Sequence, residues 1–365
     1  GDGAADRQRL LRDLLLQYIR LFRSDLTDSY THCGQAHIEL KKGTTPYRAP
    51  PLTRKSPEEE AILSSETRKL LKAGVAFHRD SPFRSNPLLI PKKNGETRYC
   101  ISYVGVNEQT VMSAYPMPDI ARNLSRARGR WHTATDLLSG FWQCELDQES
   151  IPVTAFNSPL GLLCFSRMPF GLKNSPAHFS KLGLRVFDGL DARVANLYVD
   201  DVLTSSDDYL GHIRDVGSVF RRMLQAGLAV RCNKVQFGYP ELLYLGYLVG
   251  EYGHRPDPER IKPVLAWRLS TLISKPSVNI PRWLGLLGVY RQHIPRFALL
   301  TSVFRDAVKD GVDSRRILGS LRSLVCFSLL RGLLGLCTVN AIPDFKRPFY
   351  ILTDASRLVG GAAVL

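Results

Sequence analysis

The chain has 365 residues, enough to bury a sizeable core in about two or three domains. Lysine and arginine together number 49 against 34 acidic residues, and this net charge of +15 is the balance expected of a protein that meets a polyanion. No run of about 18 uncharged apolar residues occurs and charges interrupt the N-terminal leucines, so we expect neither a membrane span nor a secretory signal.

The seven cysteines are scattered singly, without CxxC pairs. This argues against a structural zinc site and against a disulfide framework, and it favours a reducing compartment.

The first part of the chain predicts two helices. Leucines repeat at helical intervals from 7 to 22 and then give way to a polar segment. Ser56, Pro57 and the acids at 58–60 form a helix start, with serine as N-cap and proline in the first turn. We expect this second helix to end near 72–74.

A β-hairpin follows. Residues 87–91 and 97–103 have the character of strands, and Asn94-Gly95 between them is the strongest short hairpin signal. Lys92 and Lys93 therefore lie at the hairpin tip, where flexible cations can reach phosphates.

The middle of the chain alternates strands and helices. The pattern predicts a strand at 130–136, a helical patch from Ser139, a loop and strand through 156–165, and a helix over 177–190.

Further along, a helix is expected over 212–226 and strands between 228 and 249. Beyond Pro256 the pattern becomes mostly helical, which indicates a domain change. Segments 349–354 and 360–365 predict the beginning of a sheet, so we expect the chain to stop inside a domain.

Two adjacent carboxylates, Asp200 and Asp201, lie between the apolar runs 195–197 and 202–203. The flanks predict strand, tight turn and strand, which would put both aspartates at the tip of a hairpin. Aspartate also favours turns for local hydrogen-bonding reasons. However, adjacent carboxylates repel each other, and a divalent metal is the usual compensation.

A third carboxylate, Asp136, lies at the end of the predicted strand at 130–136. If the fold brings it beside Asp200, the two form an oxygen-rich site of the kind that Mg²⁺ prefers. Two such ions can lower the pKa of an attacking hydroxyl and stabilise the leaving oxygen in an in-line phosphoryl displacement. This is polymerase chemistry.

Three segments carry a resemblance to a known family. Thr135-Asp136-Leu137 with Ser139-Gly140-Phe141, then 168–176 (MPFGLKNSP), then 198–201 (YVDD) stand in the order of the catalytic blocks of reverse transcriptases. From about His37 to the end, the chain resembles the Pol polyproteins of retroviruses and LTR retrotransposons, most closely the gypsy type.

The resemblance implies an α+β fold of the right-hand polymerase type, with fingers, palm and thumb. Its implied domains are an N-terminal extension (1–45), fingers (46–130 and 151–176), palm (131–150 and 177–252), thumb and connection (253–345), and the start of a ribonuclease H-like domain (346–365).

The resemblance also implies roles at the catalytic centre. Asp136 and Asp200 match the principal ligands of two Mg²⁺ ions, with Mn²⁺ as an alternative, and Asp201 matches their supporting carboxylate. Phe141 matches the aromatic residue that lies under the sugar and excludes a ribose 2′-hydroxyl, the group that separates RNA from DNA precursors. Lys234 matches the lysine proposed to protonate departing pyrophosphate.

Further roles concern the nucleotide. Lys92 or Lys93, together with Arg98, match residues that hold the incoming triphosphate, and a guanidinium suits bidentate phosphate binding. Phe170 and Gly171 match residues that line the nucleotide pocket.

Roles in the later part of the chain follow in the same way. Leu245, Gly246 and Tyr247 resemble the segment that grips the primer end, and 283–291 resembles the thumb and connection signature. Asp354 matches the first metal-binding carboxylate of ribonuclease H. The other carboxylates of that enzyme would lie past Leu365, so we expect no ribonuclease H activity.

The chain departs from the family pattern in two places. Ser102 and Val104 stand where the family usually has an acidic residue and an arginine, so a fingers ion pair and a template contact are missing. The stretch 311–341 lacks the tryptophans and lysines common in gypsy-type elements.

The main hypothesis is therefore an RNA-directed DNA polymerase that uses deoxynucleoside triphosphates and an RNA or DNA template with a DNA or tRNA-type primer. It would act in the cytoplasm within a virus-like particle, beside other polyprotein domains such as protease and integrase. The alternatives are a catalytically silent descendant that binds nucleic acid or serves as a structural subunit, and a DNA-templated polymerase of similar palm architecture.

Overall fold

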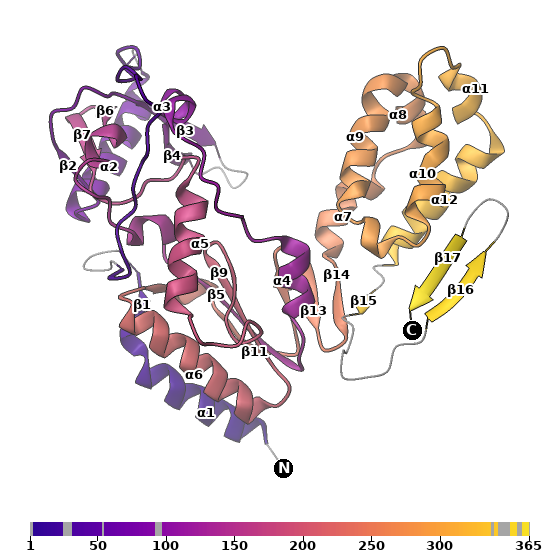
Figure 1. The fold of residues 1–365 in the computed structure, drawn as a ribbon, viewed down its shortest axis with the longest axis horizontal. Helices are drawn as coiled ribbons and strands as arrows, with labels where there is room; N and C mark the ends of the chain where they lie inside the picture. Colours follow the sequence, from indigo (N-terminus) through magenta and orange to yellow (C-terminus); the bar gives the residue numbers. More distant parts are fainter. Residues whose placement is uncertain are drawn as a thin grey trace. The chain divides into compact units, whose positions relative to one another are not determined.

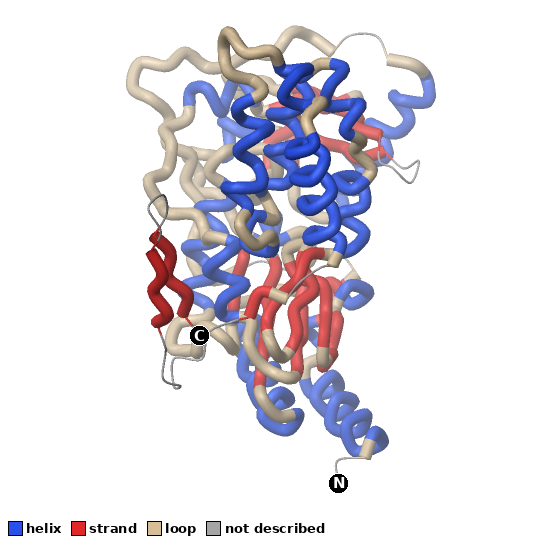
Figure 2. The backbone as a smooth tube through the Cα atoms, turned by 90° about the vertical axis from the view of Figure 1, so that its right-hand side faces the viewer, coloured by secondary structure: helices blue, strands red, loops and turns tan. Residues whose placement is uncertain are grey.

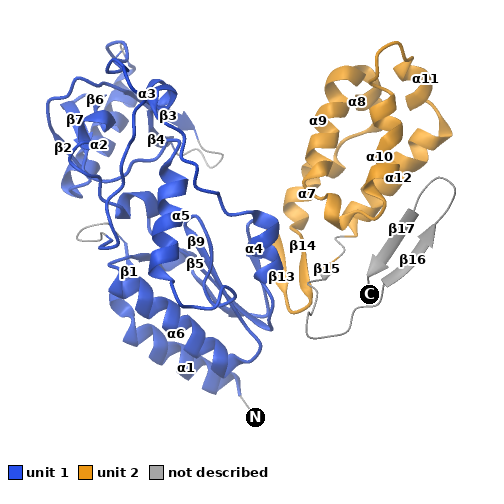
Figure 3. Cartoon of the chain, in the orientation of Figure 1, with its two compact units in different colours: residues 1–245 blue, residues 246–365 orange. Residues whose placement is uncertain are grey.

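The computed structural model describes residues 3–24, 31–52, 55–91, 97–336, 339–341, 351–355 and 360–364. The chain divides into two compact units, 1–245 and 246–365 (Figure 3). Within the described residues, no helix has the length and apolar character needed to cross a membrane.

The first unit begins with α1 (Ala4–Gln17), a 3₁₀ turn η1 (Ile19–Leu21) and the short strand β1 (Phe22–Arg23). This confirms the predicted N-terminal helix, which starts three residues earlier than expected. In Figure 1 the helix lies along α6 (Tyr209–Gln225), and Leu14 joins the buried core there.

The second predicted helix is α2 (Pro57–Lys72), and its start is confirmed in detail. The Ser56 hydroxyl accepts a hydrogen bond from the Glu59 amide (3.2 Å), and the Glu59 carboxylate accepts one from the Ser56 amide (3.1 Å). Two amides that the first helical turn cannot pair are thereby satisfied.

The predicted hairpin is β3 (Asn86–Pro91) with β4 (Thr97–Ser102), paired antiparallel. Lys92 and Lys93 lie outside the described residues. Tyr103 was expected in the second strand but precedes α3 (Val104–Gln109), because its buried ring and its hydroxyl, which donates to the Thr154 carbonyl (2.8 Å), turn the chain there.

A three-stranded antiparallel sheet of order β2-β7-β6 and three short helical segments complete the outer part of this unit. These elements are β2 (Ala76–His78), α4 (Ile120–Arg126), η3 (Ile151–Thr154), β6 (Phe156–Ser158), β7 (Gly161–Phe165) and η2 (Gly140–Gln143). The last is a single 3₁₀ turn where a helical patch from Ser139 was predicted, and Ser139 itself is left-handed (φ 49°).

A four-stranded antiparallel sheet of order β11-β5-β9-β8 carries the carboxylates. Its strands are β5 (Trp131–Asp136), β8 (Asn196–Tyr198), β9 (Asp201–Ser206) and β11 (Gln236–Tyr239).

Helices pack on this sheet: α4 and α5 (Ser175–Val186) contact β8, and α6 contacts β5 and β9. Helix α6 starts three residues before the predicted His212, because the Asp208 carboxylate accepts a hydrogen bond from the Gly211 amide (2.8 Å) and caps it.

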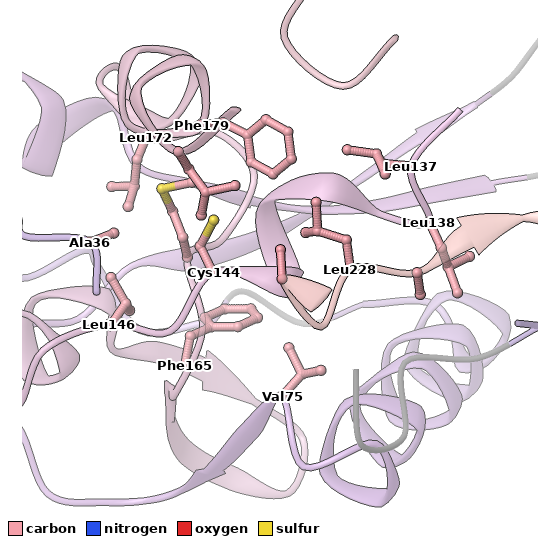
Figure 4. Close-up of a cluster of buried hydrophobic side chains, with 14 of the residues drawn as sticks. Ala36, Val75, Leu137, Leu138, Cys144, Leu146, Phe165, Leu172, Phe179 and Leu228 are labelled. Atoms are coloured by element: carbon pink, nitrogen blue, oxygen red, sulfur yellow. The ribbon is translucent and has the colours of Figure 1, made fainter. Parts of the chain in front are cut away.

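One continuous core joins these elements. Figure 4 shows buried side chains that come from distant segments, among them Ala36, Val75, Cys144, Phe165 and Phe179. The core thus holds the sheet, its helices and the outer strands as one body.

The second unit begins with the antiparallel strands β13 (Tyr247–Gly250) and β14 (Gly253–Pro256), and the later strand β15 (Asn340–Ala341) pairs with β14. Helices follow, drawn in blue in Figure 2: α7 (Pro258–Leu265), α8 (Leu269–Ser274), α9 (Pro276–Gly288), α10 (Phe297–Asp306), α11 (Ser314–Leu318) and α12 (Leu321–Gly335). Trp283 is fully buried between Phe304 and Phe327.

The last described elements are β16 (Ile351–Ala355) and β17 (Gly360–Val364), which pair antiparallel. This confirms the predicted hairpin. Asp354 lies opposite Gly361 in it, and the Asp354 side chain is outside the described part of the chain.

Candidate active site

The register of the sheet brings the three aspartates together. Tyr198 pairs with Asp201, so the turn between β8 and β9 contains only Val199 and Asp200. Asp201 was predicted at the hairpin tip, but this two-residue turn makes it the first residue of β9, directly opposite Asp136 on β5. Val199 has a left-handed backbone (φ 54°), a strained conformation for a β-branched residue.

Gly140 allows the turn to approach closely. A Cβ atom at this position would lie 3.1 Å from the Asp200 Cβ and 3.2 Å from the Phe179 ring. The Leu137 amide also donates a hydrogen bond to the Asp200 carbonyl (3.2 Å). The segment after β5 is therefore held against the tip of the hairpin.

The carboxylates face a cleft of about 610 Å³. It is lined by Ala134, Thr135, Asp136, Asp200, Asp201, Asn233, Lys234, Val235, Gln236, Leu243, Tyr244 and Leu245. Leu243 and Tyr244 belong to strand β12 (Glu241–Tyr244), and Lys234 ends the 3₁₀ turn η4 (Cys232–Lys234).

Crowding of like charges shows in the acidity of the site. Burial, followed by the charges of the neighbouring Asp200 and Asp136, raises the pKa of Asp201 to about 6. Burial and Asp136 also raise the pKa of Asp200, while Lys234 opposes both shifts. Such carboxylates are stabilised in their charged form by any nearby cation.

Two basic side chains reach Asp136. Lys234 Nζ lies 3.1 Å from Asp136 Oδ2, and Arg231 Nε lies 3.8 Å from the same oxygen. Lys234 was predicted as a site residue and lines the cleft. Arg231 had no predicted role, since nothing in its local sequence distinguishes it from a solvated arginine.

The donors suit a hard divalent cation, because carboxylate oxygens from three aspartates surround one cleft and their mutual repulsion favours a bound positive charge. Within the described residues, no three acidic, histidine or cysteine side chains already converge as a metal-binding group. Asp136 instead faces Lys234, so an ion would share or replace that contact.

Phe141, predicted to lie under the sugar, follows Gly140 in the 3₁₀ turn η2. Its half-buried ring packs against Phe170 (ring centroids 5.1 Å apart) and Phe179 (5.8 Å). Phe170 is 40% exposed, and Gly171 has a left-handed backbone (φ 97°) that favours glycine. The predicted nucleotide-pocket residues Phe141 and Phe170 are thus in contact.

Other predicted residues are not brought to the carboxylates by any described contact. Arg98 is exposed on β4, and Val104 is 64% exposed at the start of α3. Ser102 pairs with Asn86 at the end of the hairpin.

The predicted primer-binding segment falls at the boundary between the units. Leu245 lines the cleft of the first unit. In the second unit Gly246 has a left-handed backbone (φ 87°), and Tyr247 is buried with its hydroxyl donating to the Val289 carbonyl (3.3 Å).

Comparison with known proteins agrees with this geometry. Residues 90–249 match the family described as "Reverse transcriptase (RNA-dependent DNA polymerase)", whose members are generally dependent on a divalent metal. The chain is 30% identical over 84% of its length to the retrovirus-related Pol polyprotein from transposon 297 of Drosophila melanogaster, and covers 29% of that protein. It is 29% identical over 98% of its length to the Pol polyprotein from transposon opus of the same organism, and covers 36% of it. The chain thus spans about a third of these relatives.

Solved structures show the same fold. A foamy viral protease-reverse transcriptase in complex with double-stranded DNA is 20% identical, with a TM-score of 0.81 over 98% of this chain and 62% of that one. The same viral protein in complex with an RNA/DNA hybrid has a TM-score of 0.75 over 96% of this chain and 47% of that one. The predicted polymerase fold is confirmed, while the domain boundaries and residue roles stay predictions. Residues 90–249 thus match the reverse transcriptase family, and the chain is similar to the retrovirus-related Pol polyproteins of Drosophila LTR retrotransposons.

Proposed function

We propose that this chain is an RNA-directed DNA polymerase that extends a primer 3′ end with deoxynucleoside triphosphates. One observation carries the proposal: the cross-strand pair Asp136 and Asp201 and the adjacent turn residue Asp200 face one open cleft. The match of residues 90–249 to the reverse transcriptase family supports the same activity.

The three aspartates would hold two divalent ions, Mg²⁺ with Mn²⁺ as an alternative. When bound, these ions supply charge stabilisation at the attacking and leaving oxygens of the phosphoryl transfer. Phe141, supported by Phe170, would lie under the sugar and select deoxyribose. Lys234 keeps its predicted role as the proton donor to pyrophosphate.

Template and primer are further parts of the proposal. The net charge of +15 favours binding of nucleic acid, and the foamy viral relatives were solved with DNA and with an RNA/DNA hybrid. We place the activity in the cytoplasm, in a virus-like particle, with protease and integrase as companion domains of the polyprotein.

Primer extension on an RNA template with Mg²⁺ tests the proposal, with Asp200→Asn as the matched control. The wild-type chain should extend the primer, and the variant should lose at least about a thousandfold in rate, because one of the charges that holds the ions is removed. Duplex binding should be similar in both, since lysine and arginine contacts with phosphates provide it.

Three outcomes would count against the proposal. A wild-type chain that binds duplex but does not extend would indicate the catalytically silent descendant, and the loss of charge at Ser102 and Val104 gives a reason for that outcome. Extension on DNA templates alone would indicate a DNA-templated polymerase. Equal rates for Asp200→Asn and wild type would remove Asp200 from the metal site.

A further inference from the structure

Arg231 lies beside the cleft, and its main chain is tied to the segment that carries Asp136. It ends the short strand β10 (Val230–Arg231). The Leu138 amide donates a hydrogen bond to the Ala229 carbonyl (3.0 Å), and Val230 forms an antiparallel bridge with Leu137. Backbone bonds within two residues of each partner therefore fix the position of Arg231 relative to Asp136.

Two more contacts hold β10 from the other sides. Arg231 pairs in parallel with Arg23 of β1, so the N-terminal segment supports it directly. The Gln143 side chain accepts a hydrogen bond from the Ala229 amide (2.7 Å) and donates one to the Ala229 carbonyl (3.0 Å). The strand that carries Arg231 is thus braced from both neighbouring segments.

The Arg231 guanidinium reaches Asp136 through charge and not through a hydrogen bond. Its Nε is buried, lies 3.8 Å from Asp136 Oδ2, and has no hydrogen-bond partner among the described residues. The Lys234 ammonium is closer, at 3.1 Å, but its side chain is 59% exposed against 36% for Arg231. The more exposed Lys234 side chain is therefore the freer of the two to leave Asp136, whereas Arg231 has a buried Nε and a braced main chain.

We propose that Arg231 is a positioning residue that acts as a fixed counter-cation of Asp136 and sets how strongly the cleft binds a divalent ion. This rests on the proposed function, because it takes the three aspartates as the ion site. A permanent positive charge about 4 Å from one carboxylate stabilises the crowded acidic group, and it repels an added cation. The Arg231 charge therefore stabilises the folded protein but weakens the binding of a divalent ion.

Binding of Mn²⁺ alone, followed by electron paramagnetic resonance, tests this in the full chain without nucleotide or primer. Arg231→Gln should bind Mn²⁺ about threefold to tenfold more tightly than wild type, since a charge near the site is removed. Arg231→Lys, which keeps the charge, should stay near the wild-type affinity. Arg221→Gln, an exposed arginine on α6, is the control for net charge and should match wild type.

Thermal unfolding in a chelator supplies the second measurement. Arg231→Gln should lower the melting temperature while it raises Mn²⁺ affinity, and Arg231→Lys should restore both. A variant whose cleft is merely misfolded would show a lower melting temperature together with a lower Mn²⁺ affinity. Joint loss in Arg231→Gln, or an affinity equal to wild type, would overturn the inference.

Asp136→Asn separates this inference from the proposed function. If that variant loses Mn²⁺ binding while Arg231→Gln behaves as wild type, the ion site stands and only the role of Arg231 fails. If Asp136→Asn binds Mn²⁺ as wild type does, the proposed ion site fails and the inference fails with it.

Discussion

Single residues shape the surroundings of Asp200. Gly140 leaves room for the hairpin tip, and the Phe141 ring rests against Phe170 and Phe179. Edge-on and tilted ring pairs at these distances add to the stabilisation from buried area. The neighbouring rings therefore fix the orientation of Phe141. The proposed selection of sugars by shape needs such a fixed orientation.

Phe141→Ala tests the steric role. We expect ribonucleotide incorporation to rise at least tenfold relative to deoxynucleotide incorporation, because the ring no longer occupies the space of a 2′-hydroxyl. The free energy of unfolding should fall by about 2 kcal/mol, less than for a fully buried phenylalanine. Single-nucleotide incorporation with each triphosphate measures the first effect, and denaturant unfolding measures the second.

Trp142→Leu is the control for this experiment. Trp142 also contacts Phe170 (ring centroids 5.4 Å apart), but it has no predicted contact with the sugar. If both variants change sugar selectivity equally, general loosening of the cleft is responsible and Phe141 is not the selective group.

Among the elements, α5 and β8 meet closely at one glycine. A Cβ at Gly183 would overlap the Leu197 side chain, and Leu197 lies one residue before Tyr198 at the start of the acidic turn. The packing of this helix thus bears directly on the strand that positions Asp200.

Gly183→Val should therefore lower the free energy of unfolding by about 2 kcal/mol or more and also lower the extension rate, since overpacking forces the helix away from the strand. Gly285→Ala on α9 is the contrasting control, because open space surrounds that position and alanine favours a helix by up to about 1 kcal/mol. Denaturant unfolding compares the free energies of unfolding of the two variants with that of wild type. No loss of stability in Gly183→Val would contradict the observed packing.

Two buried histidines lie where the sheet meets α6: His212 on the helix and His132 on β5. His212 is hydrogen-bonded to Thr133 Oγ1 (2.7 Å) and to Ser206 Oγ (3.1 Å), and His132 to Ser205 Oγ (2.9 Å). Burial lowers the pKa of each histidine to about 4. Both are therefore neutral in the folded chain near neutral pH.

This linkage predicts a pH dependence of stability. An unfolded histidine takes up a proton near pH 6.5 and the folded ones only near pH 4, so their contribution is complete above about pH 6.5 and is lost as the pH falls toward 4. The loss is of the order of 3 kcal/mol per histidine. Denaturant unfolding at pH 7.5, 6 and 5 measures how the free energy of unfolding falls with pH. His212→Gln should make this fall smaller. Constant stability from pH 7.5 to 5 would show that the histidines titrate normally.

At the scale of the whole molecule, the charge balance governs encounters with nucleic acid. The chain carries 49 lysines and arginines against 34 acidic residues. Binding to a phosphate backbone releases condensed counterions, so affinity falls steeply as salt rises.

Duplex affinity should therefore fall by about a thousandfold or more between 50 and 200 mM salt, if roughly six or more phosphates are contacted. Fluorescence anisotropy with a labelled duplex measures the slope of log affinity against log salt. Asp200→Asn should give the same slope as wild type. A flat dependence would exclude phosphate contacts as the source of binding.

The features that could be predicted from the sequence are those that neighbouring residues determine. The Ser56 capping box, the hairpin around residues 92–96 and the strand ending at Asp136 are set by neighbouring residues, since caps, turns and side-chain alternation act over a few positions. The order of the three catalytic blocks could likewise be recognised from the sequence, and with it the family.

Only the tertiary structure decided which of these groups meet. It placed Asp201 inside β9 opposite Asp136, left little room for a side chain at Gly140, and brought Arg231 to Asp136. Those contacts join segments far apart in the chain, and they depend on strand register and core packing. Local propensity encodes neither strand register nor core packing. A shift of one residue in register would leave every local sequence pattern intact, yet it would move each side chain to the opposite face of the sheet.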